Sequence, residues 1–160
     1  MGNSMPRQFS EACSSLNDTQ RIIRARGESY TCVERSVAIN IENTTHQKVF
    51  FIKMDGGLFQ GNACDWGVCD DVYSVGALVE LKGGDITHAI QQLKRTNTRL
   101  KTEFMNSPRI KSAYVVYHKN HLQSASWQQA AAKFYNETGI WLERRKSRQE
   151  TLKTKKLFLL

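Results

Sequence analysis

The sequence predicts one α/β domain in which a mixed central β-sheet is flanked by helices. The chain has 160 residues, a length typical of one domain. Its only prolines are Pro6 and Pro108, so the stretch between them can form regular structure. Hydrophobic periodicity gives the order helix, four strands, helix, strand, helix, strand. We expect residues 1–145 to form the domain, with 1–30 as a peripheral N-terminal segment and 146–160 as a basic C-terminal tail.

The N-terminal half changes from helical to strand periodicity. Residues 8–26 are polar with scattered apolar positions, which predicts one or two helical turns on the surface. Val37, Ile39 and Ile41 alternate with other residues, as in a half-buried strand. Residues 48–54 form the next predicted strand, which an Asp-Gly turn ends.

Two further strands are expected to form a hairpin. The candidates are residues 63–69 and 75–82, and the short connection 71–74 is suited to a hairpin loop. With that loop, Asp65 lies directly opposite Glu80. The hairpin therefore predicts two carboxylates side by side on one face of the sheet.

The second half alternates helices and strands. Asp85 can cap a helix over residues 86–104, because its carboxylate can accept backbone N–H groups of the first turn. Ser124 or Ser126 is expected to cap another helix, which ends near Gly139. Strands are expected at residues 111–118 and 140–142.

The charge is unevenly distributed. The net charge is +8, and residues 143–156 contain seven basic side chains against two acidic ones. This stretch is either a solvated tail or an arm that contacts phosphates. The nucleic-acid-binding candidates are Arg144, Arg145, Lys146 and Arg148.

The cysteines and the hydropathy indicate a cytoplasmic protein. Four cysteines are too few and too scattered for a secreted disulfide scaffold, and reduced buried thiols are expected. The N-terminus lacks the apolar run of a signal peptide, and no stretch is apolar enough to span a bilayer. The cysteines are Cys13, Cys32, Cys64 and Cys69.

Glu80 and Lys82 are two residues apart on a predicted strand, so both point to the face of Leu78. Directly opposed Asp65 and Glu80 would have Cβ atoms roughly 4.5–5.5 Å apart. Like charges in that position are destabilising unless a cation lies between them. Carboxylate oxygens suit a hard ion such as Mg²⁺ or Mn²⁺, and a neighbouring lysine can orient or deprotonate a water.

Asp65 followed by Glu80-Leu81-Lys82 resembles the PD-(D/E)XK nuclease superfamily. A longer pattern is similar to small, poorly characterised members: Cys64-Asp65-Trp66, then Val79-Glu80-Leu81-Lys82-Gly83, then Asp85, Ala89 and Gln92. The resemblance covers roughly residues 48–118. It implies a restriction-endonuclease-like fold, Asp65 and Glu80 as metal ligands, and Lys82 as the catalytic lysine.

The resemblance also implies accessory residues and shows departures. Cys64 stands where the family often has proline. A further acidic residue often completes the site, and either Glu28 or Glu34 could serve. Gln92 is a possible accessory residue on the following helix, whereas neighbouring His88 and Arg99 fit a solvated face.

Other acidic and histidine residues have two interpretations. Asp70 and Asp71 are an alternative acidic pair, but their position favours a turn. Asp55 also fits a turn, although it could approach a metal. His118 and His121 follow a predicted strand and could contact phosphate or solvent.

Three hypotheses for function follow. The first is a Mg²⁺-dependent endonuclease that hydrolyses phosphodiester bonds of nucleic acid, with DNA preferred, and that could act as a homodimer. The second is a catalytically inactive protein of the same fold that binds nucleic acid or a protein partner, as in defence or counter-defence. The third is an unrelated α/β binding protein.

Overall fold

The computed structural model describes residues 5–82, 84–119 and 122–160 and contains a mixed sheet with helices. The main sheet contains β2 (Arg21–Arg24), β5 (Val49–Lys53), β6 (Trp66–Asp70), β7 (Val75–Leu81), β9 (Arg109–Tyr117) and β10 (Trp141–Lys146). The small sheet contains β3 (Ser29–Glu34), β4 (Val37–Glu42) and β11 (Leu152–Lys153), and β1 (Arg7–Gln8) pairs with β8 (Phe104–Met105). The helices are α1 (Phe9–Ser14), α2 (Ile86–Glu103), α3 (Ser124–Thr138) and α4 (Thr154–Leu157). This confirms the predicted α/β class.

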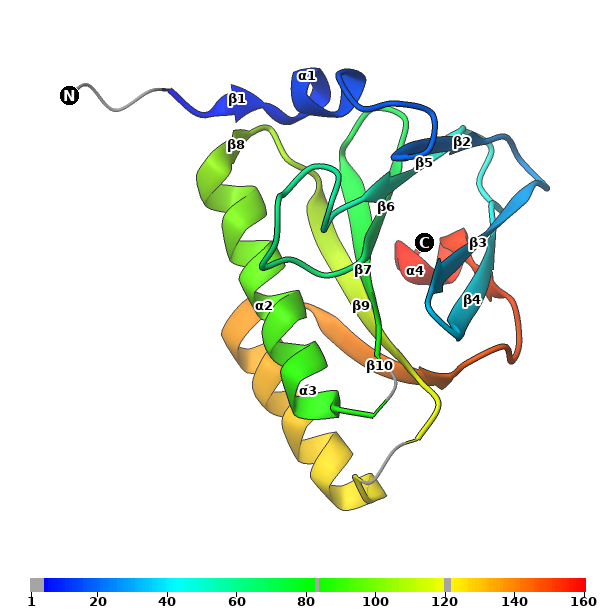
Figure 1. The fold of residues 1–160 in the computed structure, drawn as a ribbon, viewed down its shortest axis with the longest axis vertical. Helices are drawn as coiled ribbons and strands as arrows, with labels where there is room; N and C mark the ends of the chain where they lie inside the picture. The colour runs from blue at the N-terminus through cyan, green and yellow to red at the C-terminus, as the bar shows by residue number, and fades with distance from the viewer. Residues whose placement is uncertain (1–4, 83, 120–121) are drawn as a thin grey trace.

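The main sheet has the strand order β10-β9-β7-β6-β5-β2. Strands β5, β6 and β7 form an antiparallel meander, and β7, β9 and β10 are parallel. Parallel neighbours need a crossover connection. Here α2 connects β7 to β9, and α3 connects β9 to β10 (Figure 1). The carboxyl ends of the three parallel strands therefore meet at one edge of the sheet.

The two faces of the main sheet are covered differently. Helices α1, α2 and α3 contribute to one core, where Leu78 of β7 and Leu93 of α2 are fully buried. The small sheet and α4 contribute to the other core, with Val79 of β7 and Ile39 of β4. Figure 1 shows α2 and α3 on one side of the sheet and β3, β4 and α4 on the other. The expected flanking by helices thus describes one face, and a second sheet covers most of the other.

Both terminal segments contribute to the cores instead of lying at the periphery. Phe9 and Cys13 of α1 are fully buried, and β2 is an edge strand of the main sheet. In the segment expected to be a basic tail, β11 pairs with β4, and Leu157 and Phe158 are buried. These segments fold back because their apolar residues close the two cores.

The two long helices begin in different ways. Asp85 caps α2 as predicted, since its Oδ1 accepts the His88 backbone N–H at 2.9 Å. The predicted cap of α3 is wrong: its N-cap residue is Gln123, and no side chain caps it. Gly139, with φ of 75°, ends α3 as expected because glycine tolerates this left-handed conformation.

Replacing the cap of α2 should weaken the protein modestly. Asp85→Ala removes an acceptor for an N-terminal N–H group, which typically costs about 1 kcal/mol. In a chain of this size that lowers Tm by roughly 2–4 °C. Thermal unfolding followed by circular dichroism measures this shift. Ser124→Ala is the matched control and should leave Tm unchanged, and equal losses in both variants would contradict the capping assignment.

The four cysteines are free and buried, as predicted. Burial raises the pKa of the Cys13 thiol to about 12, so it stays protonated near neutral pH. Within the described residues, no helix combines the length and apolar character needed to cross a membrane.

Candidate active site

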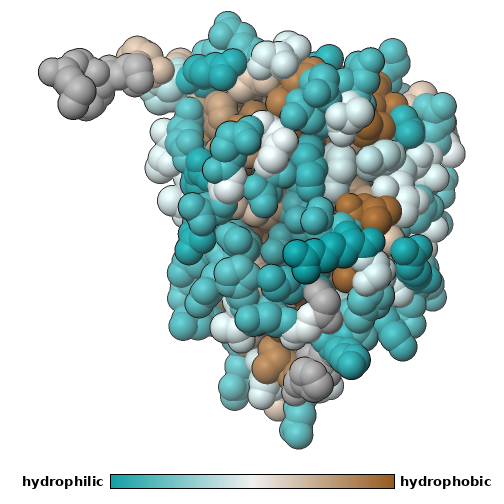
Figure 2. Space-filling model, viewed as in Figure 1, coloured by the Kyte–Doolittle hydropathy of each residue, from teal (hydrophilic) through white to brown (hydrophobic). Residues whose placement is uncertain are grey.

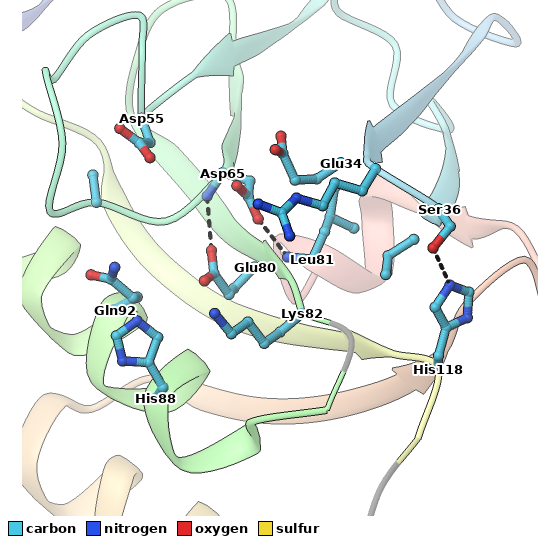
Figure 3. A pocket seen from close by; sticks show the side chains of 13 residues that line it. Glu34, Ser36, Asp55, Asp65, Glu80, Leu81, Lys82, His88, Gln92 and His118 are labelled. Atoms are coloured by element: carbon cyan, nitrogen blue, oxygen red, sulfur yellow. Dashed lines mark hydrogen bonds between the residues drawn. The ribbon is translucent and has the colours of Figure 1, made fainter.

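The β6–β7 hairpin has the register that the sequence predicted. Trp66 lies opposite Val79, and Gly67 lies opposite Leu78, which places Asp65 opposite Glu80. The Asp65 backbone N–H donates to Glu80 Oε1 at 3.1 Å. The Leu81 backbone N–H donates to Asp65 Oδ2 at 2.7 Å (Figure 3). A backbone N–H of the opposite strand segment therefore orients each carboxyl group.

A polar pocket of about 450 Å³ lies over this pair. Its walls come from the end of β7, the first turns of α2, the β3–β4 turn and the loop before β6. The lining side chains include Glu34, Asp65, Glu80, Lys82, Gln92 and His118 (Figure 3). The face of the molecule in Figure 2 is hydrophilic over most of its area, with hydrophobic side chains in small separate patches. The pocket is therefore suited to a polar or charged ligand.

Burial makes it costly to ionise both carboxyl groups. Asp65 is 9% exposed and Glu80 is 5% exposed. Burial, and then the charge of Asp65, raise the pKa of Glu80 to about 9. Burial also raises the pKa of Asp65, but hydrogen bonds from Leu81 and Glu80 oppose this shift. In the free protein Glu80 therefore keeps its proton near neutral pH.

Two lysines lie near the pair. Lys82 is half-buried and lines the pocket, and Figure 3 shows its side chain extending beside Glu80. Lys53 Nζ lies 3.4 Å from Glu34 Oε2, and its charge lowers the pKa of Asp65. Of these two lysines, only Lys82 lines the pocket, whereas Lys53 acts on Asp65 from outside it and is paired with Glu34.

The structure distinguishes the two candidates for a further acidic residue. Glu34 ends β3 and lines the pocket. Glu28 lies outside it, and its Oε1 accepts the Ala25 backbone N–H at 2.6 Å in a turn. Only Glu34 of the two is placed to face the carboxyl pair, and it does so from a strand.

Thr96 fixes the segment that carries Asp65. Its hydroxyl accepts the Cys64 backbone N–H at 2.7 Å and donates to the Gln92 carbonyl at 2.7 Å. Thr96 is fully buried, so these bonds are shielded from water. It therefore connects helix α2 to the residue that precedes Asp65.

Removing this hydroxyl should weaken both the fold and the site. Thr96→Val keeps the shape but leaves the buried Cys64 N–H without an acceptor, which costs about 1–3 kcal/mol. Tm should fall by at least 2 °C, and the Asp65 amide resonance should shift in NMR spectra. Thr98→Val is the matched control, because the exposed Thr98 hydroxyl bonds only within the helix, to the Lys94 carbonyl. Equal effects in both variants would show that Thr96 does not position Asp65.

The four basic binding candidates do not line the pocket. Arg144 is half-buried, donates to the Leu122 carbonyl at 3.0 Å and lies over the Trp127 ring. Arg145 pairs with Glu143 at 3.4 Å. Lys146 and Arg148, by contrast, are exposed.

The remaining candidates have mixed placements. Asp55 lines the pocket and also accepts the Gly61 N–H at 3.0 Å, so it serves a turn. Asp70 has the predicted turn role, since its Oδ1 accepts the Ser74 N–H at 2.7 Å. His88 and Gln92 line the pocket. Arg99 packs over the Phe59 ring instead of facing solvent, with its guanidinium 4.2 Å from the ring centroid.

Sequence reasoning missed the β3–β4 turn as part of the site. Arg35 and Ser36 form this turn and line the pocket. Ser36 Oγ lies 2.9 Å from His118 Nε2, so the turn contacts the end of β9 (Figure 3). The missing signal was strand β3, because without it no turn is expected there. Gly83 of the motif and His121 lie outside the described residues.

The oxygen atoms of Asp65 and Glu80 supply part of the coordination that a hard divalent cation needs. In the described part of the chain, no three His, Cys, Asp or Glu side chains gather around one point. Asp65 and Glu80 are two oxygen donors, and one or two carboxylates are a common protein contribution to Mg²⁺, which keeps several waters. The two carboxyl groups could therefore hold a hydrated ion, with Glu34 nearby.

Comparisons with protein-family models, with curated proteins and with solved structures gave no match. The function of the chain has to be inferred from the chemistry of its pocket and from its motif.

Proposed function

We propose that this protein is a metal-dependent nuclease that hydrolyses phosphodiester bonds of nucleic acid, with DNA as the preferred substrate. The observation that carries the proposal is the buried pair of Asp65 and Glu80, which faces a polar pocket beside Lys82. Two adjacent buried carboxyl groups destabilise the fold when both are ionised. Their retention is explained if they bind a cation during function.

The metal ligands in this proposal are Asp65 and Glu80. Mg²⁺ or Mn²⁺ bound there would acidify water and polarise a phosphate. The Glu80 carboxyl group would lose its proton as the ion binds, because ligands bind in the ionised form. Leu81 N–H would keep Asp65 oriented through its 2.7 Å bond to Oδ2.

Lys82 is the proposed catalytic lysine. Its ammonium group can orient a water, accept its proton after losing its own, or offset negative charge on the phosphate oxygens. Glu34, Gln92 and His118 line the same pocket and are available to contact the substrate.

We also propose that the fold is restriction-endonuclease-like and that the chain is of the PD-(D/E)XK type. The antiparallel β5–β7 meander, the crossover α2 and the parallel β9 support this assignment. So does the position of Asp65 directly before β6, opposite Glu80 near the end of β7, with Lys82 directly after that strand.

A plasmid assay tests the proposal. The purified chain with Mg²⁺ should nick supercoiled DNA, and chelation should stop it. Lys82→Met should lower the rate by about 10²–10⁴, the usual contribution of a general acid or base. Lys48 is exposed and lies at the opposite end of the meander, so Lys48→Gln should retain activity. Failure to cleave DNA or RNA with either Mg²⁺ or Mn²⁺ would overturn the proposal.

A non-catalytic protein of the same fold is the second candidate. Two observations favour this candidate. Glu34 is paired with Lys53. Among the described residues, no third His, Cys, Asp or Glu side chain clusters with Asp65 and Glu80. Steeply salt-dependent DNA binding without cleavage would select it.

A further inference from the structure

We infer that nucleic-acid phosphates bind a basic rim at the carboxyl edge of the parallel strands, beside the pocket. The rim consists of Arg35, His118, Lys119, Lys146 and Arg148. This inference rests on the proposed function, because that function supplies the class of ligand. It replaces Arg144 and Arg145 as the expected phosphate contacts, since both are half-buried and are engaged by other groups of the protein.

Main-chain contacts bring the three rim segments together. Tyr117 of β9 pairs with Lys146 of β10, and its carbonyl accepts the Ser147 N–H at 2.7 Å. The Arg148 N–H donates to the Ala38 carbonyl at 2.9 Å. The buried Ser147 hydroxyl accepts the Ala38 N–H at 3.0 Å. The segment after β10 is thus fixed to the start of β4.

The β3–β4 turn is fixed to the same edge. Ser36 Oγ lies 2.9 Å from the His118 ring. Arg35 and His118 also line the pocket, so the rim and the pocket share two residues. The rim is therefore continuous with the proposed site of hydrolysis.

Lys146 lies two strands away from Lys82 at the same edge of the sheet. The Lys82 N–H donates to the Val116 carbonyl, and Lys146 lies opposite Tyr117 on the next strand. Neighbouring strands are about 4.8 Å apart, so the backbones at Lys82 and Lys146 are separated by about 10 Å. The rim therefore lies close to the proposed catalytic lysine.

The charges of the rim are free to act on a ligand. Arg35, Lys119, Lys146 and Arg148 are exposed. None of them takes part in an ion pair within the described residues. Of the acidic residues in or beside these segments, Glu34 is paired with Lys53, and Glu150 is exposed two residues after Arg148. Four unpaired cations beside a pocket favour a polyanion over a neutral ligand.

The backbone gives an independent reason to assign the two arginines a function. Arg35 has φ of 55° and Arg148 has φ of 61°, a left-handed conformation that long side chains seldom adopt. Such positions cost of order 1 kcal/mol or more and are often found at functional sites. Glycine would relieve the strain at both positions, so replacing these arginines with glycine removes their charge without straining the backbone.

Binding by a chain that cannot cleave tests the rim. The probe is a fluorescent DNA duplex, titrated by anisotropy with the full Glu80→Gln chain in Mg²⁺ at several salt concentrations. Introducing R35G and R148G into the Glu80→Gln chain should weaken DNA binding at least tenfold. It should also reduce the slope of log K against log salt concentration by about 2, since each lost phosphate contact contributes roughly 0.9. The Tm should be unchanged or higher. The control Lys48→Gln with Lys101→Gln removes the same charge from exposed positions and should bind like its parent.

The outcomes separate the rim from the nuclease. The rim is overturned if the glycine variants bind like the control, if the control loses as much affinity, or if the parent binds phosphatidylserine vesicles but no DNA or RNA. If the Glu80→Gln chain binds DNA through the rim but the unsubstituted chain never nicks DNA, the rim is upheld and the nuclease is rejected. Nicking with unchanged KM in R35G and R148G would uphold the nuclease and reject the rim.

Discussion

Glu80→Gln should reduce Mg²⁺-dependent nicking of supercoiled DNA by at least about 10³-fold. The substitution keeps the size and shape of the side chain, and its Oε1 can still accept the Asp65 N–H. It removes the negative charge that would hold the metal, and metal binding supplies several kcal/mol of transition-state stabilisation. Initial rates from gel-resolved time courses measure the effect.

Asp65→Asn should have an effect of the same size, because both carboxylates would contact the same ion. Glu150→Gln is the matched control, since Glu150 is exposed and its substitution removes one negative charge away from the carboxyl pair. Isothermal titration with Mn²⁺ gives a second readout, in which Glu80→Gln and Asp65→Asn should lose binding. Nicking that persists in both variants would show that these carboxyl groups are not the metal ligands.

The stability of the metal-free protein should fall as pH rises. The pKa of Glu80 is raised from 4.5 to about 9, so the folded chain binds a proton more tightly than the unfolded chain between these values. Stability from this group is therefore fully present below about pH 4.5 and is lost progressively up to about pH 9. Between pH 6 and 8.5 the loss should be on the order of 3 kcal/mol, or roughly 6–12 °C in Tm.

Thermal unfolding in chelator at pH 6 and 8.5 measures this loss. Glu80→Gln should flatten the pH dependence and raise Tm at pH 8.5, because the amide cannot ionise. Mg²⁺ should stabilise the parent at pH 8.5 more than at pH 6, since it binds the ionised pair. Glu150→Gln should follow the parent. Parallel pH profiles for the parent and Glu80→Gln would show that Glu80 does not hold a proton in the folded chain at neutral pH.

The carboxyl pair could be predicted because it depends on local rules. A four-residue loop fixes the register of a hairpin, and the alternation of side chains then places Asp65 opposite Glu80. The Asp85 cap and the Gly139 helix end were predictable for the same reason, since each depends on residues within one turn. The cap of α3 was not, because serine at a helix start does not have to bond the backbone.

The walls of the pocket could not be predicted in this way. Glu34, Arg35 and His118 come from segments that are far apart in the sequence and meet only when the small sheet packs on the main sheet. Strand β11 has two residues and pairs with β4 over a long sequence separation, so it leaves almost no periodic signal. The basic C-terminal segment looked like a tail because its charges outnumber the few apolar residues that anchor it.

The sequence by itself therefore determined the α/β class, the order of the main elements from β4 to β10 and the Asp65–Glu80–Lys82 arrangement, but it missed β2, which lies in a stretch expected to be helical. These follow from periodicity and turn chemistry, which act over a few residues. Tertiary structure decided that Glu34 and not Glu28 faces the pair, and that Arg35, Lys146 and Arg148 gather at one edge. It also decided that Arg144 and Arg145 are half-buried and engaged by other groups of the protein. Those placements depend on packing between distant segments, and burial of the apolar residues of both termini is what brings them together.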